Sequence, residues 1–240
     1  MDKKDMHVFG HLEELRKRLI ITLAAFLVAL IAAFLYAKPI YHWLVRDLGG
    51  QLTVLGPTDI LWAYLMISGV FAIGVTIPVA AVQAWLFVAP ALSEEERGAA
   101  LGYIPALTLL FAAGIAFGYA VLFPMVLSFL REMAEGQVQT LYTVDKYFKF
   151  MLNLTLPLGL LFEMPVVVMF LTKIGLLNPY RLAKARKVSY FALIVISITI
   201  TPPDFISDVL VIVPLLILYE FSVTLSKWVY RKKLNAAAAA

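Results

Sequence analysis

VSYFALIVISITITPPD, residues 188–204, is the stretch that decides how many times this chain crosses a membrane. The apolar run 188–200 would be roughly 20 Å long as a helix, whereas the apolar core of a bilayer is about 30 Å thick. The two prolines that follow cannot continue a helix. Because a second apolar run covers residues 205–226, the two runs are either one broken span or two crossings joined by TPPD.

The charges outside these two runs favour two crossings. Basic residues precede the first run and follow the second: Arg181, Lys184, Arg186 and Lys187, then Lys227, Arg231, Lys232 and Lys233. Basic residues collect on the cytoplasmic side of a membrane, and a single crossing would leave one of these clusters outside. Two short crossings keep both clusters in the cytoplasm, so we expect TPPD to be an external turn.

The composition of the whole chain indicates a membrane protein. Of its 240 residues, 62% are hydrophobic and 15% are charged, whereas a typical soluble domain is about 25% charged. We predict an all-α polytopic protein with six transmembrane helices, the last two short, and with both termini in the cytoplasm. The predicted spans are residues 19–37, 60–88, 99–123, 150–172, 188–200 and 205–226. They form one domain over residues 1–235, and we set the alanines of 236–240 aside as an added tail.

The loops between the predicted spans fit this topology. The predicted cytoplasmic segments carry about three times as many Lys and Arg residues as the external ones, a strong orientation signal. Residues 39–48 mix aromatic and aliphatic side chains with charge, which is typical of a helix lying in the membrane interface. Residues 125–149 alternate apolar and polar positions, and they predict two short amphipathic helices around a turn at Gly136, on the external face.

Residues 11–19, HLEELRKRL, carry both signs of charge immediately before the first span. On a helix, Glu14 and Arg18 are four positions apart, which is the spacing at which their side chains interact. The basic residues Arg16, Lys17 and Arg18 are explained by topology. Acidic residues contribute little to orientation, so Glu14 fits either the polar face of an amphipathic helix or a binding site.

A second group of acids lies in ALSEEERG, residues 91–98, in the first internal loop. Ser93 followed by Glu96 makes a capping box for the next helix, and acids at a helix N-terminus are favoured by the helix dipole. A cap does not require three acids, however. A cluster of carboxylates at the cytoplasmic surface would also suit a cationic ligand, because a guanidinium group pairs with a carboxylate through two hydrogen bonds.

Glu163 lies in the middle of the fourth predicted span. An ionisable side chain at that depth is costly and is by default a candidate functional group. Pro157 and Pro165 flank it, so we expect a kink and unpaired backbone carbonyls nearby. A structural polar contact with Gln83 or Thr155 explains Glu163 equally well.

The remaining acids near the membrane have simpler interpretations. Glu220 lies near the inner end of the last predicted span, beside Tyr219, and is interpreted as an interfacial acid. Asp204 follows the two prolines and is a candidate N-cap for the last span.

The sequence gives no support for catalysis or for metal binding. It contains no cysteine, which excludes disulfides and thiolate chemistry. Its histidines, His7, His11 and His42, lack the spacing of metal ligands, and no HExxH or GxSxG motif occurs. We therefore expect neither an enzyme nor a bound cofactor.

Four motifs, taken in order, resemble the TatC family. They are HLEELRKRL at 11–19, AWLFVAPALSEEER at 84–97, FEMP at 162–165 and TPPD at 201–204. TatC is the polytopic receptor subunit of the twin-arginine protein translocase. The resemblance covers residues 8–233, and the predicted topology is similar to that of the family.

The resemblance implies a role in the export of folded proteins. Members of this family bind twin-arginine signal peptides at the cytoplasmic face of the prokaryotic inner membrane, recruit single-span partners of the TatA and TatB kinds, and work as oligomers. Transport is driven by the proton motive force. The basic charge balance of this chain then reflects topology and anionic lipid, and no nucleic-acid partner is expected.

The resemblance also assigns site residues. The signal-recognition residues of the family correspond here to Glu14, Arg16 and Glu96. The intramembrane polar residues, which are candidates for partner binding, correspond to Glu163 and Gln83. Residues that shape the site correspond to Pro78, Phe87, Pro90 and Leu92.

A proton-coupled secondary transporter that uses Glu163 is the alternative function. Helices broken by proline around an intramembrane acid are typical of such transporters. The sequence shows no inverted repeat and only one acid in the middle of a predicted span, and both observations argue against this class. Uptake of a small solute by proteoliposomes that contain this chain alone would distinguish the two functions.

Overall fold

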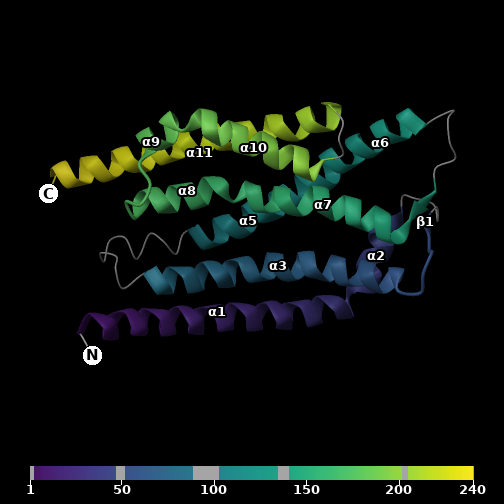
Figure 1. Ribbon diagram of the computed structural model, residues 1–240, viewed down its shortest axis with the longest axis horizontal. Coiled ribbons are helices and arrows are strands. Elements are labelled where there is room, and N and C mark those ends of the chain that lie inside the picture. The colour runs from purple at the N-terminus through teal and green to yellow at the C-terminus, as the bar shows by residue number, and fades with distance from the viewer. Residues whose placement is uncertain (1–2, 47–51, 89–102, 135–140, 202–204, 240) are drawn as a thin grey trace. The chain divides into compact units, whose positions relative to one another are not determined.

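The computed structural model describes residues 3–46, 52–88, 103–134, 141–201 and 205–239, and these residues are almost entirely helical (Figure 1). Within this part of the chain, five segments are long and apolar enough to cross a membrane: Leu12–Leu35, Asp59–Val88, Tyr103–Ala134, Val144–Lys173 and Phe205–Lys232. The predicted all-α polytopic class is confirmed. The contacts fall into two compact units, residues 1–50 with 56–108 and residues 51–55 with 109–240, and the predicted single domain stays a prediction.

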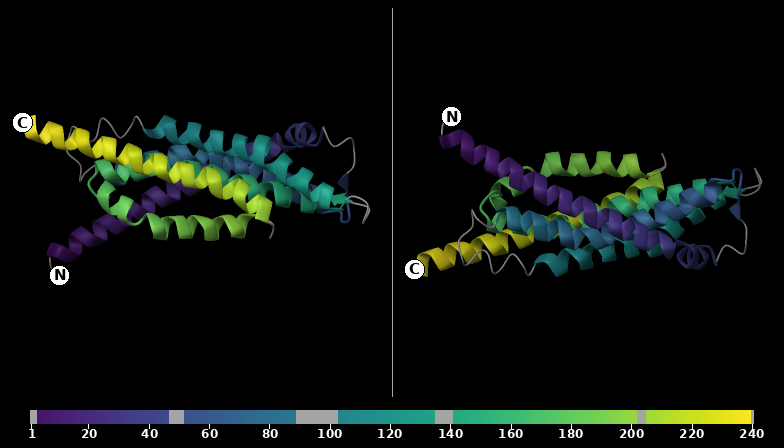
Figure 2. Two further views of the ribbon diagram at one scale, coloured as in Figure 1. Left: turned by 90° about the horizontal axis from the view of Figure 1, so that it is seen from above. Right: turned by 90° about the horizontal axis from the view of Figure 1, so that it is seen from below.

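In the first unit, helix α1 (Lys3–Leu35) packs along helix α3 (Asp59–Val88). HLEELRKRL and the first span belong to one uninterrupted helix, which Figure 2 shows from two sides. None of the described residues in the spanning window of α1 is buried within the protein. A helix that is apolar on all sides and exposed in this way is suited to a lipid environment.

One face of α3 consists of small buried residues. Ala63, Ser68, Ala72 and Thr76 recur at spacings of four and five and are buried, which places them along one side of the helix. The hydroxyl groups of Ser68 and Thr76 donate to the carbonyls of Tyr64 and Ala72, each over 2.6 Å. These bonds satisfy the only polar atoms that the two side chains bring into an apolar span.

Helix α2 (Ala37–Val45) follows α1 after Tyr36 and also packs on α3. A helix is therefore present where residues 39–48 predict one, but it begins two residues earlier. Its predicted place in the membrane interface stays a prediction, and residues 47 and 48 lie outside the described part of the chain. Ala37 is fully buried, and the ring of Tyr41 packs edge-on against Tyr64 of α3, with 5.5 Å between the ring centroids.

The third predicted span continues further than the sequence indicates. Helix α5 (Tyr103–Phe117) belongs to the first unit up to Thr108 and to the second unit from Leu109. A π-helical turn (Gly118–Leu122) joins it to α6 (Phe123–Ala134) without a break. Helix α7 (Val144–Phe162) likewise includes the end of the predicted external loop. The two amphipathic helices predicted for 125–149 are thus extensions of the third and fourth spans and are not separate elements.

A short strand pair lies in the second unit and is not predicted by the sequence. Strand β1 (Leu52–Thr53) pairs in parallel with β2 (Tyr142–Thr143), with Leu52 opposite Tyr142 and Thr53 opposite Thr143. Two residues are too few to produce the alternation of polar and apolar positions by which a strand is recognised.

Helices α5 and α7 approach each other at glycines. A Cβ atom placed on Gly114 would lie 2.8 Å from the Cα of Gly159 and 2.9 Å from the carbonyl oxygen of Leu158. A Cβ atom on Gly118 would lie 2.9 Å from the Cα of Thr155. Small residues four positions apart allow helix backbones to pack this closely in a membrane, so Gly114 of α5 and Gly118 of the π-helical turn fix the crossing with α7.

The fourth predicted span is divided at Glu163 into α7 and α8 (Met164–Lys173). Pro165 has no backbone N–H, so it cannot make the helical bond to the preceding turn. The N–H of Glu163 bonds the carbonyl of Leu160 over 3.2 Å, and the carbonyl of Glu163 accepts from Val166 over 3.0 Å. The interruption that the two prolines predict is therefore present.

The last part of the chain forms α9 (Pro179–Lys184), α10 (Arg186–Ile200) and α11 (Phe205–Ala239). Helix α10 has 15 residues and is short, as predicted. Helix α11 has 35 residues, so it is longer than the predicted span 205–226, and the prediction of a short last helix is wrong. No proline or glycine occurs after residue 226, and the basic residues and alanines there favour continued helix. Residues 202–204 of TPPD, including the candidate cap Asp204, lie outside the described residues.

Helix α11 packs on α8, α9 and α10 (Figure 1). Thr172 of α8 and Ser226 of α11 are both buried, and their hydroxyl oxygens are 2.6 Å apart. The hydroxyl of Tyr219 donates to the carbonyl of Leu182 in α9 over 2.9 Å. Polar side chains thus join these helices where apolar packing alone gives little preference for one neighbour over lipid.

The glycine crossing predicts a stability effect with a matched control. Gly114→Ala should lower the free energy of unfolding by about 1–3 kcal/mol, because the new methyl group meets backbone that cannot move aside cheaply. Gly69→Ala on α3 meets nothing within 4 Å, and it should be neutral or stabilising by up to about 1 kcal/mol from helix propensity. Unfolding in detergent by added dodecyl sulfate, followed by circular dichroism, measures both. Equal effects of the two substitutions would contradict the close approach at Gly114.

Candidate functional site

Two of the sequence-predicted site residues, Glu14 and Gln83, are brought together by a third residue, Arg18. The Nη2 atom of Arg18 donates to Oε1 of Glu14 over 3.1 Å, one turn earlier on α1. Its Nη1 atom donates to Oε1 of Gln83 on α3 over 3.2 Å. The spacing predicted for Glu14 and Arg18 is confirmed, whereas the contact with α3 is not predicted by the sequence.

The cluster is only partly shielded from solvent. The side chain of Glu14 is 31% exposed and that of Arg18 is 24% exposed. The Nε atom of Arg18 is buried and has no hydrogen-bond partner in the described part of the chain. Glu14 makes one hydrogen bond to the described residues, through Oε1. Its second oxygen, Oε2, is therefore available to a further donor.

The other charged residues of HLEELRKRL lie away from this cluster. Arg16 and Lys17 are exposed, and so is Glu13. Residues two positions apart on a helix point in different directions, so Arg16 does not share the face of Glu14. The structure therefore separates Arg18, which is held between two helices, from basic residues that extend into solvent.

The remaining residues predicted around the cytoplasmic site are only partly described. Pro78 and Phe87 lie on α3 and are half-buried, and α3 continues through Pro78 to Val88. Glu96, Pro90 and Leu92 lie outside the described residues. The predicted joint action of Glu14 and Glu96 therefore stays a prediction.

Glu163 lies in the second unit at the break between α7 and α8. Its side chain is half-buried, and its Oε1 atom is buried without a hydrogen-bond partner among the described residues. Thr155, one of its predicted partners, is buried beside Gly118 at the crossing of α5 and α7. The predicted pairing of Glu163 with Gln83 stays a prediction, since the described partner of the Gln83 oxygen is Arg18.

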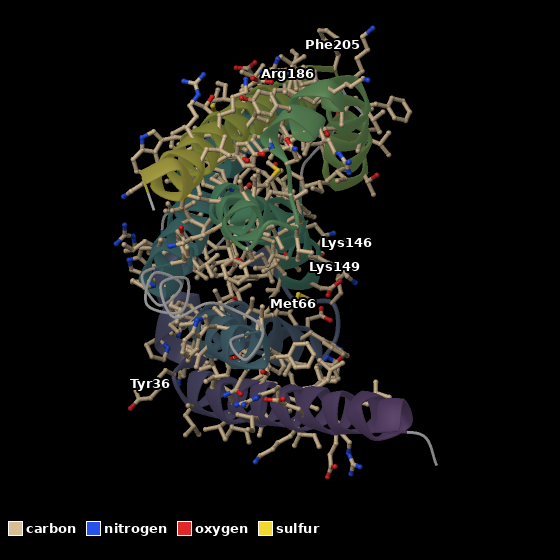
Figure 3. All side chains as sticks on the ribbon, turned by 90° about the vertical axis from the view of Figure 1, so that its left-hand side faces the viewer. Tyr36, Met66, Lys146, Lys149, Arg186 and Phe205 are labelled. Carbon is tan, nitrogen blue, oxygen red and sulfur yellow. The ribbon has the colours of Figure 1, made fainter. Side chains whose placement is uncertain are left out.

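Sequence reasoning missed a second charged cluster, which joins α10 to α11. Arg186, labelled in Figure 3, donates from Nε to Oε1 of Glu220 over 2.7 Å and from Nη2 to Oε2 over 2.8 Å. The hydroxyl of Tyr190 donates to the same Oε1 over 2.6 Å. Glu220 was interpreted as a simple interfacial acid, but both of its oxygens are bound within the protein. The two ends of the pair are 34 residues apart, and no local spacing reveals such a contact.

The Arg186–Glu220 pair is expected to stabilise the packing of α10 on α11. Glu220→Gln should lower the unfolding midpoint, because it removes the charge that both Arg186 and Tyr190 contact. Glu132→Gln, at an exposed acid of α6, should leave the midpoint unchanged. The exchange Arg186→Glu with Glu220→Arg should restore part of the loss. Detergent unfolding followed by circular dichroism measures all three, and no loss with Glu220→Gln would show that the pair is dispensable.

These features define a class of protein. The chain is a helical, multi-pass membrane protein with a charged cluster on its first helix. At a helix break in a later span it carries a carboxyl oxygen that has no hydrogen-bond partner among the described residues.

Comparisons with known proteins give the family. The family model of the Sec-independent protein translocase protein (TatC) matches residues 10–214. The chain is 64% identical over 240 residues to TatCd of Bacillus subtilis (strain 168), covering 100% of this chain and 99% of that protein. It is 38% identical over 238 residues to TatC of Aquifex aeolicus (strain VF5), covering 95% and 98%. A crystal structure of the twin-arginine translocase receptor TatC matches with a TM-score of 0.79 and 35% identity, covering 91% of this chain and 99% of that chain. The chain belongs to the TatC family, and is thus a membrane subunit of the twin-arginine protein translocase.

Proposed function

We propose that this protein is the receptor subunit that binds twin-arginine signal peptides at the cytoplasmic face of the membrane. The observation that carries this proposal is Glu14, a half-buried carboxylate on α1 with one oxygen held by Arg18 and the other available. Carboxylates bind guanidinium groups through two directed hydrogen bonds, which an ammonium group cannot reproduce. The name of the crystal structure that matches this chain, a receptor of the same translocase, supports the proposal.

The proposed site combines the first helix with the first internal loop. Glu14 and Glu96 supply two carboxylates for two consecutive arginines, and the exposed Arg16 contacts the peptide beside them. Pro78, Phe87, Pro90 and Leu92 shape the surface around these groups. The predicted topology, with both termini in the cytoplasm of a prokaryotic cell, supports this location because HLEELRKRL then faces the side on which cargo is folded.

Signal-peptide binding gives a direct test with an adjacent control. Purified protein in detergent should bind a peptide with Arg-Arg more tightly than its Lys-Lys twin. Glu14→Gln and Glu96→Gln should each weaken Arg-Arg binding by about tenfold, the effect of losing one hydrogen bond between charged groups. Glu13→Gln removes the same charge from an exposed neighbour and should have little effect. Fluorescence anisotropy of labelled peptides measures these affinities.

Equal binding of both peptides, unaffected by the two variants, would contradict the receptor function. The carboxylates would then be helix caps and interface charges. The alternative, a proton-coupled transporter that uses Glu163, would become the preferred hypothesis, and solute uptake by proteoliposomes would be the next measurement.

We also infer that Glu163 contributes to the binding of single-span partners of the TatA and TatB kinds within a working oligomer driven by the proton motive force. A buried carboxyl oxygen without a partner is costly in a membrane and suits a donor from another helix. Pro165 adds an interruption of the helix at the same level. A polar group on a partner helix would satisfy this site.

Cysteine crosslinking tests this inference without background, because the chain contains no cysteine. Val167 lies one turn after Glu163 and is 43% exposed, and Leu27 on α1 has a similar exposure of 48%; each is replaced by cysteine. Val167→Cys should crosslink to a single-cysteine partner in membranes, and Glu163→Leu should reduce the yield severalfold. Similar yields from both positions, or no effect of Glu163→Leu, would contradict a specific partner site at Glu163.

A further inference from the structure

The carboxylate of Glu14 is already in contact with a guanidinium group of the protein itself. Arg18 reaches Oε1 of Glu14 through a single hydrogen bond of 3.1 Å. The Arg186–Glu220 pair in the same chain is bound through two hydrogen bonds of 2.7 Å and 2.8 Å, with Tyr190 as a third donor. The ion pair between Arg18 and Glu14 therefore has one hydrogen bond, whereas the pair between Arg186 and Glu220 has two.

The guanidinium of Arg18 is shared between two acceptors. Its second contact is the neutral amide oxygen of Gln83, on a helix 65 residues further along the chain. Its Nε atom lies buried without a partner in the described part of the protein. Loss of the bond to Glu14 would leave Arg18 with its bond to Gln83, so Arg18 can release the carboxylate without leaving the interface between α1 and α3.

We propose that Arg18 is a built-in competitor for Glu14, and that it determines how strongly the site prefers arginine to lysine; this rests on Glu14 being part of the signal-peptide site. A ligand cation at Glu14 has to displace Arg18 from Oε1 or bind Oε2 beside it. A guanidinium group is planar and weakly hydrated, and it makes two hydrogen bonds to a carboxylate, so it can replace what Arg18 gives up. An ammonium group is a strongly hydrated point charge. It is repelled by Arg18 and does not make the second hydrogen bond to the carboxylate that a guanidinium group makes.

Specificity of this kind comes from a repulsive element as well as an attractive one. Glu14 attracts any cation. Arg18 lowers the affinity for every cation that cannot replace the hydrogen bond between Arg18 and Glu14 with bonds of its own. Gln83 moderates the penalty because it holds the guanidinium partly away from Glu14. Removal of Gln83 therefore strengthens the competitor, whereas removal of the charge of Arg18 eliminates it.

The experiment compares four variants with Arg-Arg and Lys-Lys signal peptides, in the same anisotropy assay. Arg18→Gln should tighten binding of the Lys-Lys peptide by about two- to fivefold, the effect of one partly exposed ion pair, and should tighten Arg-Arg binding less, so that the preference for Arg-Arg falls. Gln83→Met, which keeps the size and removes the acceptor, should weaken binding of both peptides. Lys17→Gln removes the same charge from the exposed neighbour of Arg18 and should leave the preference unchanged. Glu14→Gln reports on the receptor function itself.

The outcomes separate this inference from the proposed function. If wild-type protein prefers Arg-Arg and Glu14→Gln abolishes the preference, the receptor function stands; weaker binding of both peptides by Arg18→Gln would then overturn only the competitor role. If the wild type shows no preference and Glu14→Gln has no effect, both proposals fail. Gln83→Met keeps the test decisive should Arg18→Gln fail to fold, because unchanged affinities with Gln83→Met would also overturn the competitor role.

Discussion

Inside a membrane no water is available, so every polar group of the protein must find a hydrogen-bond partner within the protein. This requirement determines most of the structure of the spanning segments. Lipid offers no hydrogen bonds, so a spanning segment must be helical and its side-chain hydroxyls must find partners within the protein. Ser68, Thr76, Thr172 and Ser222 meet this need by donating to the carbonyl one turn earlier. Against that background, three buried atoms without a hydrogen-bond partner among the described residues are exceptions: Oε1 of Glu163, Nε of Arg18 and Nε1 of Trp85. Such exceptions are the natural places to look for binding.

The pairs Arg18–Glu14 and Arg186–Glu220, two of the ion pairs in the described part of the chain, show how a stabilising contact differs from a binding site built of the same groups. Glu220 accepts three hydrogen bonds from Arg186 and Tyr190, and both of its oxygens are bound within the protein. Glu14 is bound at one oxygen by a guanidinium that it shares with Gln83. Both carboxylates are partly exposed and both are paired with a guanidinium group, so burial and charge do not distinguish them. The two carboxylates differ instead in how many of the hydrogen-bonding groups around them remain unused.

Much of the fold can be predicted from the sequence, because the length and composition of an apolar run respond to the bilayer directly. The contact of Glu14 with Arg18 can also be predicted, since it follows from a spacing of four on one helix. The orientation that Lys and Arg indicate stays a prediction. The continuation of the third span from Phe123 to Ala134 was not predicted, because the mixture of apolar and polar side chains in this segment is equally typical of a separate amphipathic helix. The contacts of Arg18 with Gln83 and of Arg186 with Glu220 join distant parts of one chain, and no local spacing encodes them.

The short helix α10 is held at both ends by α11, and this has a consequence for the membrane around it. Arg186, its first residue, binds Glu220, and Thr201, just after its last, donates a hydrogen bond to the carboxylate of Asp208. The two anchor points on α11 are twelve residues apart, or about 18 Å along the helix. Because both ends are fixed, α10 cannot slide or tilt freely to match a bilayer core of about 30 Å. As the predicted fifth span, α10 would therefore require either thinning of the lipid or basic side chains that extend to the interface. The polar contacts with α11 fix the position of α10 along α11, so α10 could not remove this mismatch by moving.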